Sequence, residues 1–164
     1  MKLFGIVGWK NAGKTGLMER LVHEIVGRGY RVSTLKHAHH AFDVDHPGKD
    51  SYRHRAAGAA EVLVVSDQRW ALMAELRSQP EPSLDALLEK MDDVDLILIE
   101  GFKTAPHPKI EVWRRENGHP LIATNDTRIR AIASDGPLEA ADLPVMDLND
   151  AVEIADFILA ETGL

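Results

Sequence analysis

Residues 8–15, GWKNAGKT, have the spacing of a phosphate-binding loop, G-x-x-x-x-G-K-[ST]. In such a loop two glycines, here Gly8 and Gly13, let the backbone bend so that successive amide N–H groups face an anion. Lys14 would then reach the β- and γ-phosphates, and the Thr15 hydroxyl would ligate Mg²⁺. The stretch therefore predicts a site for a nucleoside polyphosphate. The loop residues that we expect to bind it are Gly8, Lys10, Asn11, Ala12, Gly13, Lys14, Thr15 and Gly16.

A carboxylate that could complete the metal site follows an apolar run at residues 96–99. The sequence there is LILIEGFK, which places Glu100 at the end of a buried strand. Ligands of α/β proteins bind at the carboxyl ends of parallel strands, and a P-loop needs a second acid for its metal. Glu100 would hold Mg²⁺ through a water or polarise a nucleophile, and we assign catalytic roles to Lys14 and Glu100. The alternative is a solvated glutamate without a ligand.

The segment between Lys36 and Arg55 is rich in polar side chains and holds five of the eight histidines. Its basic side chains and histidines are hydrogen-bond donors suited to an anion such as a pterin phosphate, and its carboxylates suit Mg²⁺. A long polar loop after a second strand is a natural sensor of the γ-phosphate, and the alternative is a solvated loop. The donors are Lys36, His37, His39, His40, Lys49 and Arg53, and the acceptors are Asp43, Asp45 and Asp50.

Apolar runs alternate with stretches of helical period, which is typical of an α/β sheet protein. The expected strands are residues 3–7, 31–35, 95–99, 109–114 and 129–133. Four helices are expected. The apolar face of the first holds Leu17, Leu21, Val22 and Ile25, and a short second helix spans residues 50–60. Ser83 caps the third, which carries Leu84, Leu87, Leu88 and Met91, and the last carries Val152, Ala155, Ile158 and Leu159.

Two further strand-like runs, residues 61–65 and 69–76, are joined by Ser66, Asp67 and Gln68, which is the spacing of a hairpin. Such a hairpin is a candidate dimer element, because an extra strand pair can extend a sheet across subunits. No stretch is rich enough in Gly, Pro or Ser to divide the chain, so we expect a single nucleotide-binding domain over residues 1–164. The predicted fold class is α/β: a three-layer P-loop NTPase fold, with a mainly parallel sheet, helices on both faces and a β-hairpin extension.

Composition narrows the classes of function. The net charge is −7, whereas broad nucleic-acid binding needs a basic surface, so no nucleic-acid partner is expected. The chain has no Cys, and any metal must therefore bind to His, carboxylates or hydroxyls. The apolar run at the start is too short for a signal peptide, and no run approaches the roughly 20 residues of a membrane span. We expect a cytoplasmic protein without a membrane partner.

Four motifs together resemble those of one family. They are the loop at residues 8–15, the stretch from Lys36 through GKDS at residues 48–51, AGA at residues 57–59 and EGFK at residues 100–103. With them the chain resembles the molybdopterin-guanine dinucleotide biosynthesis protein B family over most of its 164 residues. The loop alone is common to many proteins, and the GKDS stretch beside EGFK is the specific part of the likeness.

The resemblance implies a GTP-binding, homodimeric P-loop protein with weak GTPase activity. Such proteins assist a partner guanylyltransferase, which attaches GMP to molybdopterin to form the guanine dinucleotide form of the molybdenum cofactor, and the molybdenum pterin is a further candidate ligand. On this likeness Thr15, Glu100 and Asp50 hold Mg²⁺, with Asp45 as the fallback for Asp50. Outside the loop we expect the nucleotide to contact Asp50, on this likeness, and His37, Lys49 and Arg53, on the donor chemistry of the polar segment.

Two other functions compete with this one. A metallochaperone GTPase could deliver a transition metal through His37, His39 and His40, with His46 nearby, although related nickel proteins also use Cys, which this chain lacks. A small-molecule kinase would need an Arg-rich lid, and the sequence shows no obvious one. We therefore carry the metallochaperone as the alternative.

The residues that would read a base stay open. A carboxylate can accept hydrogen bonds from N1–H and N2–H₂ of guanine, and Asp126 and Asp135 flank a predicted strand. A turn explains Asn125 and Asp126 equally well. Trp9, inside the loop, is the best candidate to stack on a base or pterin. Related dimeric ATPases carry a Lys where Trp9 stands, so the action of Lys10 across subunits is also open.

Overall fold

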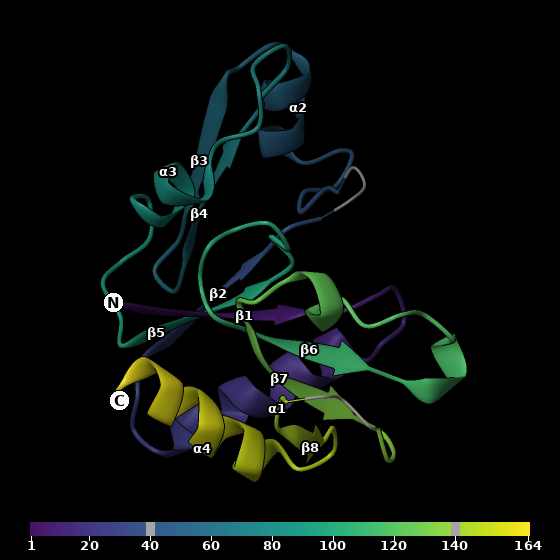
Figure 1. The fold of residues 1–164 in the computed structure, drawn as a ribbon. Helices are drawn as coiled ribbons and strands as arrows, with labels where there is room; N and C mark the ends of the chain where they lie inside the picture. Colours follow the sequence, from purple (N-terminus) through teal and green to yellow (C-terminus); the bar gives the residue numbers. More distant parts are fainter. Residues whose placement is uncertain (39–41, 139–141) are drawn as a thin grey trace. The chain divides into compact units, whose positions relative to one another are not determined.

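A parallel six-stranded sheet organises residues 1–37 and 91–164 (Figure 1). The computed structural model describes residues 1–38, 42–138 and 142–164. The strand order is β2-β5-β1-β6-β7-β8, and all neighbouring strands are parallel. Their carboxyl ends therefore share one edge, with β1 between β5 and β6. The strands are β1 (Lys2–Val7), β2 (Val32–Lys36), β5 (Leu96–Glu100), β6 (Lys109–Trp113), β7 (Ile129–Ser134) and β8 (Val145–Asp147).

The core of this unit lies where the sheet meets two helices. Helix α1 (Lys14–Gly27) and helix α4 (Ala151–Thr162) lie side by side in Figure 1 and contact each other. Leu17, Leu21 and Ile25 are fully buried along α1, as their helical spacing predicts. The central strands are apolar almost throughout, because both of their faces are covered. This packing fixes the position of the loop between β1 and α1.

Residues 38–90 form a second compact unit. The predicted hairpin is confirmed: β3 (Glu61–Val65) and β4 (Trp70–Ala74) pair antiparallel, and the Ser66 hydroxyl accepts hydrogen bonds from the turn amides of Gln68 and Arg69. The unit also contains α2 (Asp50–Ala56) and α3 (Leu84–Leu88). Ser83 caps α3 as expected, since its side chain accepts from the amide of Ala86.

Several boundaries differ from the prediction. Helix α2 ends at Ala56 rather than at residue 60, because Gly58 has φ 113° and breaks the helical backbone. Helix α3 ends before Met91. Val152, predicted on the buried face of α4, is 52% exposed. Strand β8 was not predicted, since three residues are too few for a visible alternation. Two short 3₁₀ helices, η1 (Arg115–Asn117) and η2 (Ala123–Asn125), were also not predicted.

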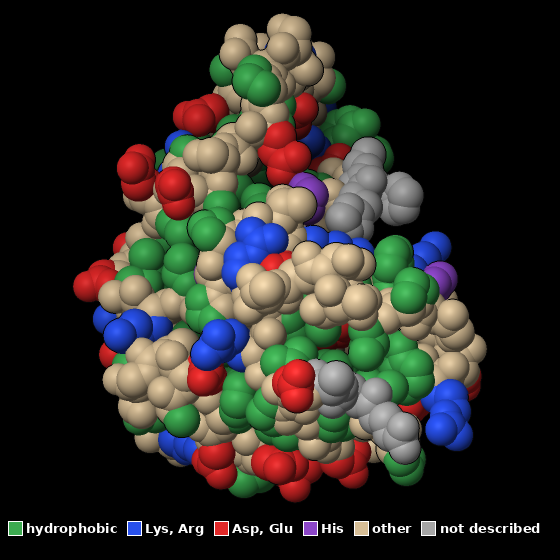
Figure 2. All heavy atoms as spheres, in the orientation of Figure 1, with side chains coloured by type: hydrophobic (Ala, Val, Ile, Leu, Met, Phe, Trp, Pro, Cys, Tyr) green, Lys and Arg blue, Asp and Glu red, His purple; other side chains and the backbone are tan. Residues whose placement is uncertain are grey.

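The fold class otherwise agrees with the prediction of a mainly parallel sheet with helices and an antiparallel hairpin. Acidic side chains gather on the face shown in Figure 2 over the region of α4 and β8, consistent with the net charge of −7. Across residues 1–38, 42–138 and 142–164, none of the helices combines the length and apolar character needed to span a membrane.

Candidate nucleotide-binding site

The loop after β1 has a backbone that depends on its glycines. Gly8 has φ 154° and Gly13 φ 99°. A Cβ atom on Gly8 would lie 2.4 Å from the carbonyl oxygen of Val112, a contact that no side chain could tolerate without a backbone shift. Gly13 is the N-cap residue of α1 and has no side chain to accept from the first amides of the helix. Those N–H groups are therefore free of a side-chain cap and suit an anion.

Lys14 lies folded over this loop. Its Nζ donates to the carbonyl oxygen of Trp9 at 2.8 Å. Burial lowers the pKa of Lys14, the carboxylate of Glu100 opposes this, and the positive charges of Lys103 and Lys36 lower the pKa further. The positive charges of Lys36 and Lys103 are thus close enough to Lys14 to affect its protonation. A bound polyanion would neutralise these three charges.

Glu100 joins this group through the pairing of the strands. In the register of the sheet, Glu100 of β5 stands opposite Ile6 of β1 on one side and Lys36 of β2 on the other. The Glu100 side chain is 12% exposed, and its Oε2 lies 3.4 Å from Lys36 Nζ. Thr15, in the first turn of α1, is exposed. A carboxylate and a hydroxyl beside a phosphate-binding loop are the oxygen donors that Mg²⁺ takes, so these residues fit that ion.

The EGFK motif is held in an unusual backbone conformation beside His37. Gly101 has φ 94° and Phe102 has φ 46°. The His37 amide donates to the carbonyl oxygen of Glu100, and the His37 ring lies 4.6 Å from the Phe102 ring between centroids. A Cβ on Gly101 would lie 3.0 Å from that of His37. The close approach of these two motifs explains why a glycine follows Glu100.

Trp9 is fixed by the fold at the edge of the loop. Its Nε1 donates to the carbonyl oxygen of Pro120 at 2.8 Å, and its ring lies 5.0 Å from the His119 ring. Lys103 Nζ lies 4.6 Å from the centroid of the Trp9 ring, a cation–π contact. The indole is thus partnered by protein groups, and its stacking on a base or pterin stays a prediction.

Lys10 and Asn11 are exposed at the tip of the loop, and Ala12 is buried beneath it. Asn11 has φ 63°, a left-handed conformation that Asn tolerates better than most residues. The action of Lys10 across subunits stays a prediction.

A buried carboxylate anchors the segment that follows β6. Glu111 is 0% exposed and accepts hydrogen bonds from the amides of Ile122 and Ala123, both at 2.8 Å. Burial raises the pKa of Glu111, and the two amide donors oppose this. The anchored segment carries the partners of Trp9. Nothing in the sequence pattern distinguished Glu111 from a surface residue of an edge strand.

Of the predicted binding residues in the polar segment, His37 lies in the main-sheet unit, whereas Lys49, Asp50 and Arg53 lie in the second unit. Asp50 and Arg53 are one turn apart on α2, 3.8 Å from each other, with side chains 86% and 75% exposed. Lys49 is the N-cap residue of that helix. His39 and His40 lie outside the described residues. The roles of Lys49, Asp50 and Arg53 toward a nucleotide stay predictions.

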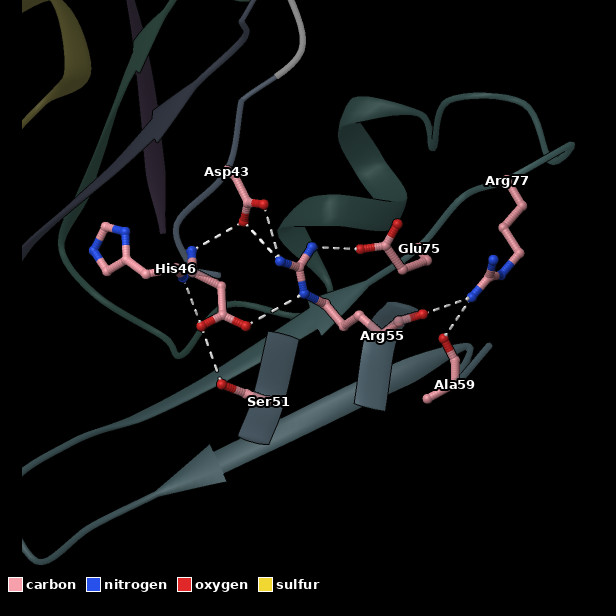
Figure 3. Close-up of polar contacts among 8 residues, drawn as sticks. Asp43, His46, Ser51, Arg55, Ala59, Glu75 and Arg77 are labelled. Carbon is pink, nitrogen blue, oxygen red and sulfur yellow. Dashed lines mark hydrogen bonds and ion pairs between the residues drawn. The ribbon is translucent and has the colours of Figure 1, made fainter. Parts of the chain in front are cut away.

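Asp45, the fallback acid, has structural contacts in its own segment. Its Oδ1 accepts from the Ser51 hydroxyl at 3.0 Å, and its Oδ2 lies 3.5 Å from Arg55 Nε. The same guanidinium donates to Asp43 at 2.9 Å and to Glu75 at 2.7 Å (Figure 3). These hydrogen bonds, that to Glu75 first, raise the pKa of Arg55. Asp43 and Asp45 therefore hold the fold of this segment, and the fallback role of Asp45 stays a prediction.

Two further basic groups of the site were missed in the sequence. Lys103 belongs to the EGFK motif but had been given no role. Arg114, after β6, lies over the loop: a Cβ on Gly13 would be 3.3 Å from its Nε and from its Nη2. Arg114 Nε is buried and has no hydrogen-bond partner among the described residues. No spacing rule connects Arg114 to Gly13, because only the pairing of β6 with β1 brings them together.

The metallochaperone alternative finds no cluster in the part of the chain that the structure describes. Within residues 1–38, 42–138 and 142–164, no three His, Cys, Asp or Glu side chains are grouped to hold a metal ion. His37 packs against Gly101 and Phe102 at the end of β5. His39 and His40 are outside the described ranges.

The parallel sheet, the glycine-dependent loop after β1 and the acid at the end of β5 define a P-loop NTPase fold. The model of one family, described as molybdopterin guanine dinucleotide synthesis protein B, matches residues 3–135, and the chain belongs to this family.

Relatives and solved structures agree with this assignment. The chain is 44% identical over 160 residues to the molybdopterin-guanine dinucleotide biosynthesis adapter protein of Escherichia coli, covering 96% of this chain and 91% of the relative. It is 45% identical over 159 residues to the protein of the same name from Haemophilus influenzae, covering 95% and 86%. The crystal structure of Bacillus subtilis MobB is similar with a TM-score of 0.79 and 29% identity, over 99% of this chain and 98% of that one.

Proposed function

We propose that the chain is an adapter protein of molybdopterin guanine dinucleotide biosynthesis, which binds GTP with Mg²⁺ and acts with a guanylyltransferase partner. The observation that carries the proposal is the arrangement of Lys14, Thr15 and Glu100 at the loop of a chain of this family. Its relatives from two bacteria carry the adapter name. As a homodimer in the cytoplasm, it would present the nucleotide to that partner. The molybdenum pterin is a candidate second ligand of the chain.

The roles of the residues follow from their chemistry. The loop amides and Lys14 bind the phosphates, and Thr15 and Glu100 would hold Mg²⁺. The ion, when bound, neutralises charge on the β- and γ-phosphates. Hydrolysis by the isolated protein is slow, because phosphoryl transfer also needs an aligned water and a further positive charge on the γ-phosphate. A partner protein or the second subunit would complete the site.

The first test is a reconstitution of the biosynthetic step. Guanylyltransferase, molybdenum cofactor and limiting Mg·GTP are mixed with and without this protein, and the guanine dinucleotide cofactor is quantified. We expect the protein to raise the yield, Lys14→Ala to remove the rise by abolishing nucleotide binding, and the exposed-lysine control Lys90→Ala to keep it. A rise that survives Lys14→Ala would show that the loop is not part of the mechanism. No rise with the wild-type protein would contradict the adapter proposal.

The second test separates binding from hydrolysis. Glu100→Ala is expected to bind GTP with an affinity close to that of the wild type but to lose Mg²⁺-dependent hydrolysis, because the carboxylate acts on the ion and not on the phosphates. Binding is measured by calorimetry and phosphate release in a single-turnover assay. Unchanged Mg²⁺-dependent hydrolysis in this variant would remove Glu100 from its assigned role.

A further inference from the structure

An open cavity lies at the carboxyl ends of β7 and β8, and no function has yet been assigned to it. Its volume is about 320 Å³, which is within the range of small-ligand sites. Asp135 and Gly136 line it after β7, and Met146, Asp147 and Asn149 line it along and after β8. Because all six strands are parallel, the cavity lies on the same edge of the sheet as the phosphate-binding loop.

One wall of the cavity is joined to the loop through a buried leucine that does not itself line the cavity. A Cβ on Gly13 would lie 3.5 Å from Cδ2 of Leu148, the residue between Asp147 and Asn149. The carbonyl oxygen of Leu148 also accepts from Arg20 Nη2 at 2.8 Å, which ties this wall to α1. The cavity wall and the loop are therefore connected through a single residue, which places the cavity near a ligand with phosphates on the loop amides.

The other wall is tied to the site through β6. Arg114 lies against Gly13, and the amide of the next residue, Arg115, donates to Oδ1 of Asp135 at 3.2 Å. Strands β1, β6 and β7 are neighbours, and adjacent strands are about 4.8 Å apart. The end of β7 is thus two strand spacings from the end of β1, a span that the sugar of a nucleotide bridges between its phosphates and its base.

We propose that this cavity takes the base of the nucleotide whose phosphates the loop binds, and that Asp135 selects guanine by accepting hydrogen bonds from its N1–H and N2–H₂ groups. The inference rests on the proposed function and adds the residue that decides which base is bound. A carboxylate accepts from both groups at once, whereas adenine offers neither a donor at N1 nor an amino group at C2.

The hydrogen bonds of the other candidates favour Asp135. Asp126 is 8% exposed, and its carboxylate is taken up by Arg128 at 2.6 Å and Lys109 at 3.7 Å. Asp147 uses Oδ1 for two hydrogen bonds from Asn149, at 2.8 and 3.1 Å. Asp135 accepts one amide hydrogen bond on Oδ1, which leaves acceptor positions on both oxygens.

The test is an exchange of base preference. Affinities for GTP, xanthosine triphosphate and ATP are measured by calorimetry in the presence of Mg²⁺. Wild-type protein is expected to prefer GTP. Asp135→Asn is expected to bind GTP roughly tenfold more weakly or worse, and to gain affinity for xanthosine triphosphate, because the amide N–H₂ can donate to the oxygen at C2 of xanthine. Asn keeps an oxygen to accept from the Arg115 amide, so the fold is retained.

Asp147→Asn is the matched control, since the second carboxylate of the cavity is changed in the same way, and GTP should stay the preferred nucleotide. Wild-type affinity for inosine triphosphate, which lacks the amino group at C2, gives a readout that needs no variant: roughly tenfold weaker binding than GTP is expected.

The possible results distinguish the two proposals. If the wild type binds none of these nucleotides, the proposed function fails, and the base assignment fails with it. If the wild type binds GTP through Lys14 but Asp135→Asn still prefers GTP over xanthosine triphosphate, the loop assignment stands and the role of Asp135 is overturned. Equal wild-type affinities for GTP and inosine triphosphate would likewise overturn it.

Discussion

Buried polar residues of the main sheet have consequences that reach beyond the nucleotide site. His107 is 6% exposed, and neither ring nitrogen has a hydrogen-bond partner among the described residues. The ring packs against the backbone of β1, where a Cβ on Gly5 would lie 2.6 Å from Nε2. Burial, followed by the charges of Lys109 and Arg128, lowers the pKa of His107 to about 4, and Asp126 partly opposes this.

Because the pKa of His107 is lowered in the folded protein, we expect the protein to lose stability in mild acid. The unfolded chain binds a proton at His107 near pH 6.5, whereas the folded chain does so only near pH 4, so the free energy of unfolding falls as the pH is lowered between these values. The contribution of this one group is up to roughly 3 kcal/mol. Urea unfolding at pH 7 and pH 4.5 should show a smaller difference in His107→Gln than in the wild type. Equal differences would contradict the assignment.

Residues of the site differed in how far the sequence could predict them. The loop residues and Thr15 are neighbours along the chain, so their chemistry was visible as a pattern, and Glu100 followed from the rule for strand ends. Arg114 is distant in sequence from Gly13, and its position depends on the order of strands β1 and β6. Asp135 was one of several acids beside a strand, and hydrogen bonds decide among them only once the fold is known.

At the scale of elements, Arg55 links the parts of the second unit. Its guanidinium, 14% exposed, contacts Asp43 in the loop before α2, Asp45 in the same loop and Glu75 just after β4 (Figure 3). Each partner is a carboxylate, and the guanidinium fork can bind several at once. Helix α2 buries no residue completely, so polar contacts rather than apolar packing hold it in place.

We expect Arg55→Gln to loosen this unit and leave the main sheet intact. Without the guanidinium three carboxylates repel one another, so the amides of α2 should exchange with deuterium roughly tenfold faster, measured by mass spectrometry of peptides. Arg53→Gln is the matched control, because the Arg53 side chain is 75% exposed and lies 3.8 Å from a single acid. Unchanged exchange in Arg55→Gln would show that the cluster does not hold the helix.

Elements with a strong local signal were predicted well. The hairpin followed from the two apolar runs around Ser66, and α1 from its apolar face. Strand β8 is three residues long and pairs with β7 alone in the described part of the chain, so its formation depends on the sheet already present. The end of α2 depended on the conformation of Gly58, which an isolated sequence pattern does not reveal.

At the scale of the whole molecule, the hairpin presents an apolar surface to solvent. Val65 and Trp70 stand opposite each other in the ladder and are 72% and 63% exposed, and Leu63 is 61% exposed. Strands β3 and β4 form a two-stranded sheet of their own. Such a hairpin is marginal alone, and an exposed apolar patch is typical of an interface. We therefore expect it to pack against a second copy of the chain in the proposed homodimer.

The prediction is tested by charge substitution. Val65→Lys combined with Trp70→Lys should raise the dimer dissociation constant at least about tenfold, because both lysines would be buried in the interface. Light scattering over a concentration series gives the mass and the dissociation constant. Val152→Lys, on α4 and 52% exposed, is the control and should leave the association unchanged. A wild-type protein that is monomeric throughout would exclude the dimer.

The position of β1 in the sheet has a consequence for synthesis on the ribosome. This strand carries the phosphate-binding loop at its end and leaves the ribosome before its neighbours in the sheet, because Leu3 pairs with Ile97, on the order of 90 residues later. At 5–20 residues per second, the strand waits roughly 5 to 20 s for its neighbour. During that time an apolar segment is unpaired and open to chaperones. The loop is thus made well before the strands β5 and β6 that fix its position.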